Sequence, residues 1–384
     1  MDKQSNLLVT GANGHVGFNL VKMLMDDGYG AIRVSVRDAS DPKKTSALKG
    51  IGVTDFASLD IRDAATFAKV SEGIDVLFHV AATYRYHTGS ADADAEMIRD
   101  SIDGARSAIE AAAMNGIKKV VLTSSIVTLP ITKGGKTAPD EGQWTQDLQT
   151  PYIRAKVEAE QLAWQLAEER GVDLVTVLPG AVIGPNFGRG TQTTDYLIAI
   201  KKGLLRMGCP PIRLAMVDVR DVARVHILAA EQDAKGRFIV VGDTPPNFAE
   251  MIATMRKIDK TVPGSLMTMP RFMVPVMPMF DWAGNKFLGT PRTMTPASAS
   301  TFSKGDLLAS NARAKRELDW SSGFTLEQSL RDTMAEIKRV SKASLTNGPF
   351  GDFVRVFPKR LQHLQRNAVL AKARNRMIAQ SRTV

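Results

Sequence analysis

The chain has almost no cysteine and little that could hold a metal ion. Cys209 is its one cysteine among 384 residues, which excludes an internal disulfide and favours a reducing compartment. Its five histidines show no metal-ligand spacing, so we expect no metal site. No apolar run is long enough to span a bilayer, and no basic stretch followed by an apolar one opens the chain. We therefore expect a cytoplasmic protein without a signal peptide.

Acidic residues are scarce in one region only, the C-terminal tail. Residues 341–384 carry nine Lys or Arg and one acid, Asp352, whereas the rest of the chain holds 41 basic and 39 acidic residues. The formal net charge of +10 therefore belongs mostly to the tail. A solvated extension is one interpretation, and weak peripheral contact with an anionic membrane through Phe353, Val354, Val356 and Phe357 is another. We do not expect nucleic-acid binding, because the charge lacks a folded reader domain.

Strand and helix patterns alternate along the first half of the chain. Short buried strands are expected at 7–9, 32–36, 53–59, 76–80, 120–123 and 174–178. Intervening helices, among them 102–114 and 152–169, imply right-handed crossovers and a parallel sheet with helices on both faces. The predicted fold class is α/β, a doubly wound parallel sheet of the Rossmann type with a smaller C-terminal substrate lobe. We place the core at 1–180 with returning segments near 212–242, the lobe mainly at 181–340, and the basic tail at 341–384.

A glycine-rich turn joins the first expected strand to the first expected helix. Gly11 permits a tight turn, Gly14 lets a pyrophosphate approach the backbone, and Gly17 lets the helix pack closely on the sheet. The helix start then offers N–H groups and a positive dipole end to phosphates. We expect residues 1–180 to bind a dinucleotide through Gly11, Asn13, Gly14, His15, Val16 and Gly17.

A basic residue follows the second expected strand, at the position where an NAD-binding site usually has a carboxylate. Arg37 follows this strand directly, and Lys44 comes shortly after it. Arg37 could pair with a 2′-phosphate through two parallel N–H bonds, and Lys44 could add a second charge. Asp38 favours the opposite choice, a ribose hydroxyl, and a solvated arginine is the plainest alternative. We predict NADP as the cofactor.

Tyr152 and Lys156 stand four residues apart at the start of an expected helix and therefore share one face. A free tyrosine has a pKa of about 10, which a nearby ammonium lowers by stabilising the phenolate. Tyr152 could then give a proton to a carbonyl oxygen as hydride arrives, or take one in reverse, while Lys156 also bonds the nicotinamide ribose. Ser124 and Ser125 end the fifth strand, where a hydroxyl could orient the same oxygen.

These motifs, in this order, resemble the extended short-chain dehydrogenase/reductases, nearest the dihydroflavonol-reductase and NAD-dependent epimerase/dehydratase-like branch. The resemblance covers residues 5–340. It rests on the runs 10–17, 60–63, 79–82, 121–125, 152–156, 178–185, 217–223 and 311–320.

The resemblance implies roles for further residues. Ser125 aligns better than Ser124 with the family's catalytic serine, so the implied catalytic set is Ser125, Tyr152 and Lys156. A homodimer through the helices at 102–114 and 152–169 would follow the family's pattern. The implied cofactor contacts are Asp60 and Ile61 at adenine, Val80, Ala81 and Ala82 along the cofactor, Pro179, Gly180, Ala181 and Val182 at the nicotinamide, and Arg37 and Lys44 at the 2′-phosphate.

Departures from the family pattern bear on the reaction. Sugar-nucleotide dehydratases carry Asp-Glu where Ile126-Val127 stand, and epimerases commonly carry an asparagine that Pro179-Gly180 lack. Ser101 and Ala155 replace a frequent Asn and Ser, which weakens a proton relay but keeps the Tyr/Lys pair. Plain carbonyl or alcohol redox chemistry is thus favoured. A sugar-nucleotide epimerase or dehydratase and a non-catalytic NADP-binding regulatory protein are the alternatives.

The Met/Pro-rich segment 261–296 bears on the substrate. Its methionines could line an adaptable apolar pocket or simply pack beneath a loop. If they line a pocket, the substrate is apolar or aromatic. We expect the stretch from Val262 to Trp282 to be irregular and partly buried, and Asp218 and Asp221 to cap a helix rather than to catalyse.

Overall fold

The computed structural model describes residues 1–82, 90–134, 136–186, 188, 191–290 and 292–344. Residues 1–333 form one compact unit, and a second unit begins at Met334. The strands are β1 (Leu7–Thr10), β2 (Ile32–Val36), β3 (Asp55–Ser58), β4 (Val76–His79), β5 (Lys119–Thr123), β6 (Leu174–Pro179), β7 (Ala181–Ile183), β8 (Met216–Asp218) and β9 (Gly236–Val240). The helices are α1 (His15–Asp26), α2 (Pro42–Gly50), α3 (Ala64–Val70), α4 (Ala91–Asn115), α5 (Pro151–Arg170), α6 (Gln192–Lys201), α7 (Val219–Glu231), α8 (Phe248–Ile258), α9 (Met277–Leu288), α10 (Pro296–Ser303), α11 (Ala312–Leu318) and α12 (Leu326–Ser344), with 3-10 helices η1 (Ile126–Thr128) and η2 (Arg271–Val276).

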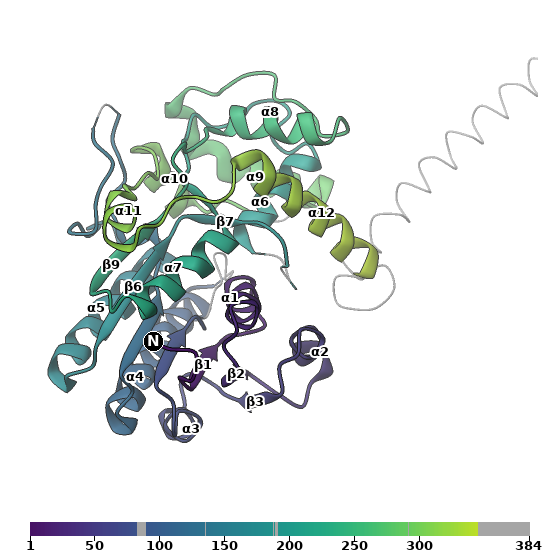
Figure 1. Cartoon of the computed structure of the whole chain (residues 1–384). Helices are drawn as coiled ribbons and strands as arrows, with labels where there is room; N and C mark the ends of the chain where they lie inside the picture. Colours follow the sequence, from purple (N-terminus) through teal and green to yellow (C-terminus); the bar gives the residue numbers. More distant parts are fainter. Residues whose placement is uncertain (83–89, 135, 187, 189–190, 291, 345–384) are drawn as a thin grey trace, which may run out of the picture. The chain divides into compact units, whose positions relative to one another are not determined.

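Seven strands form one parallel sheet in the order β3-β2-β1-β4-β5-β6-β9. The chain order reverses between the neighbours β1 and β4, and the carboxyl ends of strands at such a point are where ligands bind in open α/β sheets. Helices α1 and α7 pack together on one face of the sheet, and α3, α4 and α5 cover the other (Figure 1). The predicted fold class, a doubly wound Rossmann-type sheet, is confirmed.

The two faces of the sheet bury separate cores because side chains alternate along each strand. Leu7 and Val9 of β1 join the core beneath α1 and α7, whereas Leu8 joins the one beneath α4 and α5. Parallel strands covered on both faces read as continuous apolar runs in the sequence. All six strands expected from such runs are present, with β3 shorter than the expected 53–59.

Two expectations about helices were wrong. The helix expected at 102–114 begins at Ala91, because Ser90 caps it by accepting a hydrogen bond from Ala93 N, and Asp92 and Asp94 suit its positive end. The stretch expected to be irregular contains η2 and the start of α9. Proline is tolerated there because Pro278 lies in the first turn of α9, where an N–H would have no partner within the helix.

The second half of the chain returns to the core twice. Helix α7 packs against α1, and β9 lies at the sheet edge beside β6. Strands β7 and β8 pair in parallel as a separate small sheet just beyond β6. The division into a core and a substrate lobe stays a prediction, and the tail beyond residue 344 lies outside the described residues. Within the described part of the chain, no helix is long and apolar enough to cross a membrane.

Candidate active site

The glycine turn between β1 and α1 forms a cradle that side chains would fill. Gly11 has a φ of +66°, and a Cβ there would lie 2.8 Å from the Cα of Ala81. A Cβ on Gly17 would lie 2.3 Å from the carbonyl oxygen of Gly11, so the first turn of α1 packs directly on the loop. Gly14 is the N-cap of α1 and has no side chain to cap it. This cradle fits a phosphate group, which would take the place of a cap at the helix N-terminus.

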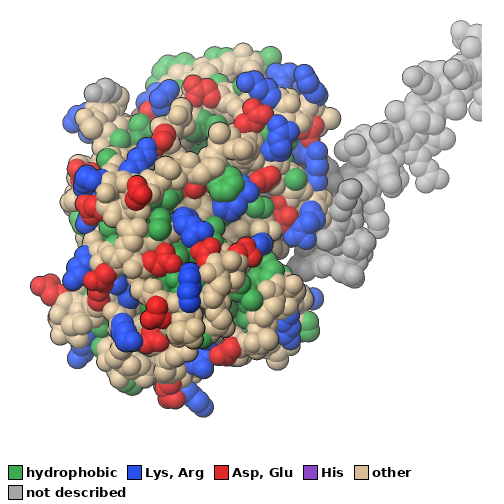
Figure 2. Space-filling model, in the orientation of Figure 1, with side chains coloured by type: hydrophobic (Ala, Val, Ile, Leu, Met, Phe, Trp, Pro, Cys, Tyr) green, Lys and Arg blue, Asp and Glu red, His purple; other side chains and the backbone are tan. Residues whose placement is uncertain are grey.

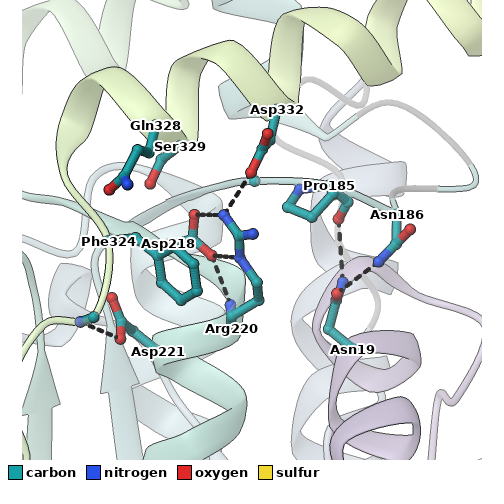
Figure 3. A network of polar contacts seen from close by, with 12 residues as sticks. Asn19, Pro185, Asn186, Asp218, Arg220, Asp221, Phe324, Gln328, Ser329 and Asp332 are labelled. Atoms are coloured by element: carbon teal, nitrogen blue, oxygen red, sulfur yellow. Dashed lines mark hydrogen bonds and ion pairs between the residues drawn. The ribbon is translucent and has the colours of Figure 1, made fainter.

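Side chains of α1 tie the segment after β7 to this cradle (Figure 3). Asn19 donates from Nδ2 to the carbonyl oxygen of Pro185 at 3.2 Å and accepts from Asn186 Nδ2 at 3.0 Å. The buried ring of His15 places Nε2 3.0 Å from the same carbonyl oxygen. The predicted phosphate turn is therefore held beside Pro185 and Asn186, which follow β7.

The segment from Pro179 to Val182 is positioned by close backbone packing. A Cβ on Gly180 would lie 2.5 Å from the carbonyl oxygen of Ala215, so glycine is required by the approach of the two chains. Ala181 N donates to that oxygen at 2.9 Å, which starts the pairing of β7 with β8. This small sheet begins at residue 181, directly after β6, where the substrate lobe is expected to start.

Asp218 and Asp221 have structural roles at the start of α7 (Figure 3). Asp218 caps α7 by accepting from Arg220 N, and its two carboxylate oxygens also accept from the Arg220 guanidinium at 2.8 and 2.9 Å. Arg220 reaches Asp332 at 2.7 Å and stacks on Phe324 at 3.6 Å. Asp221 accepts from Gly323 N at 2.9 Å. The expectation of helix capping is confirmed for Asp218, whereas for Asp221 it was wrong, because this acid lies within the first turn of α7 and holds the loop at Gly323 instead.

One face of α5 carries Tyr152, Lys156 and Glu160 at successive turns. Pro151 occupies the first turn of the helix, and the buried Tyr152 follows it directly. The Nζ of Lys156 donates to the carbonyl oxygen of Thr123, the last residue of β5, at 3.2 Å. Burial lowers the pKa of Lys156 to about 8, and the nearby charge of Glu160 opposes that shift. The lysine is thereby fixed beside the strand end as a cation that loses its proton easily.

The two serines after β5 do different things. Ser124 is buried and donates from Oγ to Glu160 at 2.5 Å. Ser125 caps η1 by accepting from Val127 N at 3.3 Å, and η1 packs against α5. Because Ser124 is committed to the carboxylate behind the lysine, Ser125 is the better candidate to contact a substrate.

A buried ion pair behind Lys156 was missed by the sequence analysis. The side chains of Glu160 and Arg237 are 1% and 8% exposed, and Nε of Arg237 lies 2.9 Å from the Glu160 carboxylate. Thr176 of β6 donates to Glu160 at 2.8 Å, and Arg237 of β9 donates to Thr128 at 2.7 Å and stacks on Trp144. A signal was available, since Glu160 follows Lys156 by the same four residues that separate Lys156 from Tyr152.

Two buried histidines support the ends of neighbouring strands. Burial, helped by the charge of Lys156, lowers the pKa of His79 to about 3, and its Nδ1 lies 3.1 Å from Thr10 Oγ1. Thr10 Oγ1 also accepts from Ala81 N at 3.1 Å, which brings Ala81 beside the glycine cradle. His226 of α7 lies 2.8 Å from Thr123 Oγ1, so the residue that anchors Lys156 is itself held from the other face of the sheet.

The expected adenosine end combines an exposed base with an engaged acid. Arg37 is exposed directly after β2, and Lys44 in α2 lies 3.7 Å from Asp41. Asp38 accepts from both the backbone N and the Oγ of Ser40, so its carboxylate already has local partners. Arg37 is thus an exposed base at the end of β2, and its contact with a 2′-phosphate stays a prediction.

The acid expected at adenine, Asp60, is paired with Arg62. Hydrogen bonds from Arg62 at 2.9 and 2.6 Å lower the pKa of Asp60 to about 2, and the charge of Arg37 adds to this effect. Ile61 packs against α4 so closely that a Cβ at Gly104 would lie 2.7 Å from its Cδ1. The adenine contact itself stays a prediction.

Known proteins provide an independent comparison. Residues 7–242 match the family model described as the NAD dependent epimerase/dehydratase family. Cinnamoyl-CoA reductase 1 of Oryza sativa subsp. japonica is 32% identical over 274 residues, which are 67% of this chain and 77% of that protein. An anthocyanidin reductase ((2S)-flavan-3-ol-forming) of Vitis vinifera is 31% identical over 257 residues, or 60% and 74% of the two chains.

Among solved structures, that of the protein gox2253 is similar with a TM-score of 0.73 and 25% identity, covering 88% of this chain and 98% of that one. The order of the motifs, the parallel sheet and these likenesses agree. The chain belongs to the NAD-dependent epimerase/dehydratase family, in the dihydroflavonol-reductase-like branch of the extended short-chain dehydrogenase/reductases, and is an oxidoreductase acting on carbonyl or alcohol groups.

Proposed function

We propose that the protein is an NADP-dependent reductase of a ketone or aldehyde on a small apolar or aromatic molecule, able also to oxidise the corresponding alcohol. The observation that carries this proposal is the shared face of α5, where Tyr152 and Lys156 stand one turn apart and Lys156 is anchored to the end of β5. The names of the cinnamoyl-CoA and anthocyanidin reductases support an aromatic substrate.

The residues of this face divide the work of carbonyl reduction. When bound, the dinucleotide supplies the hydride. Tyr152 donates its hydroxyl proton to the carbonyl oxygen, and the Lys156 cation favours the phenolate that remains. Ser125 orients the same oxygen by hydrogen bonding. Ile126, buried where a sugar-nucleotide dehydratase would carry an acid, offers no group for dehydration.

NADP rather than NAD is supported by the end of β2. Arg37 is an exposed guanidinium there, and its fork of N–H groups matches a phosphate better than a hydroxyl. Lys44 adds a second cation on α2, while Asp38 already accepts two hydrogen bonds from Ser40. The carboxylate that would favour NAD is thereby occupied.

The test is NADPH oxidation by purified protein against a panel of aromatic aldehydes, ketones and acyl-CoA thioesters. A Tyr152→Phe variant keeps the ring but removes the proton, so we expect kcat to fall by about 10²–10⁴-fold. NADPH binding, followed by fluorescence, should persist in the variant. Full activity of the variant would remove Tyr152 from the mechanism, and NADPH binding without turnover of any carbonyl would favour a regulatory protein.

The assembly and location belong to the same proposal. Helices α4 and α5 pack side by side on one face of the sheet, and we propose that this pair forms the homodimer interface. The single cysteine, Cys209, is buried, which fits a cytoplasmic enzyme. Light scattering on the eluting protein measures the dimer directly, and a monomeric mass at working concentration would contradict it.

A further inference from the structure

Helix α9 turns an apolar face toward solvent. Val276, Met279, Phe280 and Phe287 recur at helical spacing and are all exposed, Met279 at 61% and Phe287 at 72%. The opposite side of the helix faces the protein, since Asp281 is buried and a Cβ on Gly284 would lie 2.4 Å from Leu204 Cδ1. This reverses the usual pattern of a surface helix, whose apolar stripe packs on the core.

The apolar surface continues beyond the helix. Of the eleven large hydrophobic side chains exposed in the described part of the chain, nine lie between Met207 and Phe287. Phe272, on the adjoining η2, is 81% exposed. Figure 2 shows hydrophobic side chains at the upper edge of the molecule, the edge where α8 lies in Figure 1. We name as the α9 face the residues Phe272, Val276, Met279, Phe280, Trp282 and Phe287.

A cation, Lys286, lies beside the α9 face. Lys286 is exposed, with its Nζ 4.9 Å from the ring centre of Trp282 and 5.7 Å from that of Phe287. The acid of the helix, Asp281, is turned inward, where it accepts from Arg292 at 2.6 Å and from Thr293 N at 2.8 Å. The exposed aromatic rings of α9 therefore lie beside an ammonium group. The carboxylate of the same helix, Asp281, is buried and paired with Arg292.

We propose that the α9 face docks on an anionic lipid bilayer, with α9 lying in the plane of the interface. Aromatic side chains bordered by lysine suit this position because their rings enter the headgroup region while the ammonium stays with lipid phosphates. A second copy of the chain fits less well. The residues of the α9 face include no carboxylate, so in a two-fold contact Lys286 would find no acid there to pair with.

Vesicle flotation with the full-length chain tests the proposal. The probes are phosphatidylcholine vesicles with and without phosphatidylserine, compared for wild type, a Phe280→Ser/Phe287→Ser double variant and a Leu148→Ser control. Leu148 is an exposed apolar residue outside α4, α5 and the α9 face. We expect wild type and control to bind the anionic vesicles, and the double variant to bind about tenfold or more weakly. Lys286→Glu should weaken binding to the vesicles that contain phosphatidylserine and should leave binding to pure phosphatidylcholine vesicles unchanged.

Two further measurements distinguish the α9 face from the basic tail and from a loss of folding. Removal of residues 345–384, which carry eight basic side chains, should leave binding that still depends on Phe280 and Phe287. Thermal unfolding of each variant confirms that it is folded. Equal vesicle binding by the double variant and wild type would overturn the proposal. So would an absence of binding by wild type, or a dimer that dissociates in the double variant without any lipid binding.

Discussion

Helices α5 and α9 distribute polar and apolar groups in opposite ways. Helix α5 turns Tyr152, Lys156 and Glu160 toward the sheet, where burial costs free energy unless each group finds a partner. Helix α9 turns Phe280 and Phe287 outward, where they remain in contact with water. Helix α5 is uncommon in burying polar groups, and helix α9 in exposing apolar ones. The comparison teaches where to look for function, because both proposals made for this protein rest on such departures.

The largest expected effect on stability lies in the polar face of α5. Glu160→Ala would leave the Arg237 guanidinium buried without its carboxylate, so the free energy of unfolding should fall by about 3–5 kcal/mol. Glu158, which pairs with Arg154 on the outer side of the same helix, is the matched control, and Glu158→Ala should cost about 1 kcal/mol or less. Urea unfolding of both variants measures the difference. If both variants lose the same free energy of unfolding, the buried Glu160–Arg237 pair matters no more to stability than the exposed Glu158–Arg154 pair.

The second prediction concerns Arg37, which lies outside α5 and, unlike the polar groups of that helix, is exposed. Arg37→Ala removes hydrogen bonds to a 2′-phosphate, and hydrogen bonds to charged groups contribute about 1.5–3 kcal/mol. The KM for NADPH should therefore rise about 10–100-fold, while that for NADH changes little. Steady-state kinetics with both cofactors give the ratio. A parallel rise for NADH would show that Arg37 does not read the phosphate.

The pH dependence tests the electrostatics of the α5 face. Because burial lowers the pKa of Lys156 to about 8, kcat/KM should decline as pH rises through about 8 and the cation is lost. Glu160→Gln removes the charge that opposes this shift, so the decline should move to lower pH. The lowered pKa of Lys156 also affects stability. Below about pH 8, folding must bury the charged ammonium, which reduces the free energy of unfolding. As pH rises from about 8 to the unfolded pKa of about 10.4, this loss disappears and the free energy of unfolding rises. If the pH profile of Glu160→Gln equals that of wild type, the Glu160 carboxylate does not influence the pKa of Lys156.

The smallest expected effect is on α9 itself. Phe287→Ala should change the free energy of unfolding by about 0.5 kcal/mol or less, since its ring is exposed in the folded protein. Leu166→Ala, at a buried position of α5, should instead cost about 2–5 kcal/mol. Thermal unfolding of the two variants in parallel measures the contrast. A large loss from Phe287→Ala would mean that the α9 face is covered in solution.

The sheet could be predicted from sequence because its signals are local. Runs such as Val120 to Thr123 identify buried strands, and Gly11 and Gly17 are required by backbone geometry alone. The Glu160–Arg237 pair could not be found this way, because its members come from α5 and β9 and meet only through the fold. The α9 face was missed because an apolar stripe in a sequence predicts burial, whichever way the helix later turns.

Thr123 connects Lys156, the proposed helper of Tyr152, to the helices on both faces of the sheet. Its carbonyl oxygen is bonded by Lys156 from α5, and its hydroxyl is held 2.8 Å from Nε2 of His226 on α7. Burial lowers the pKa of His226 to about 4, so this ring stays neutral throughout the physiological pH range. A fall in pH within that range therefore does not charge the ring that contacts the Thr123 hydroxyl. The position of Lys156 at the end of β5 therefore depends on α5 and α7 together, so a substitution in either helix should be felt at this one strand end.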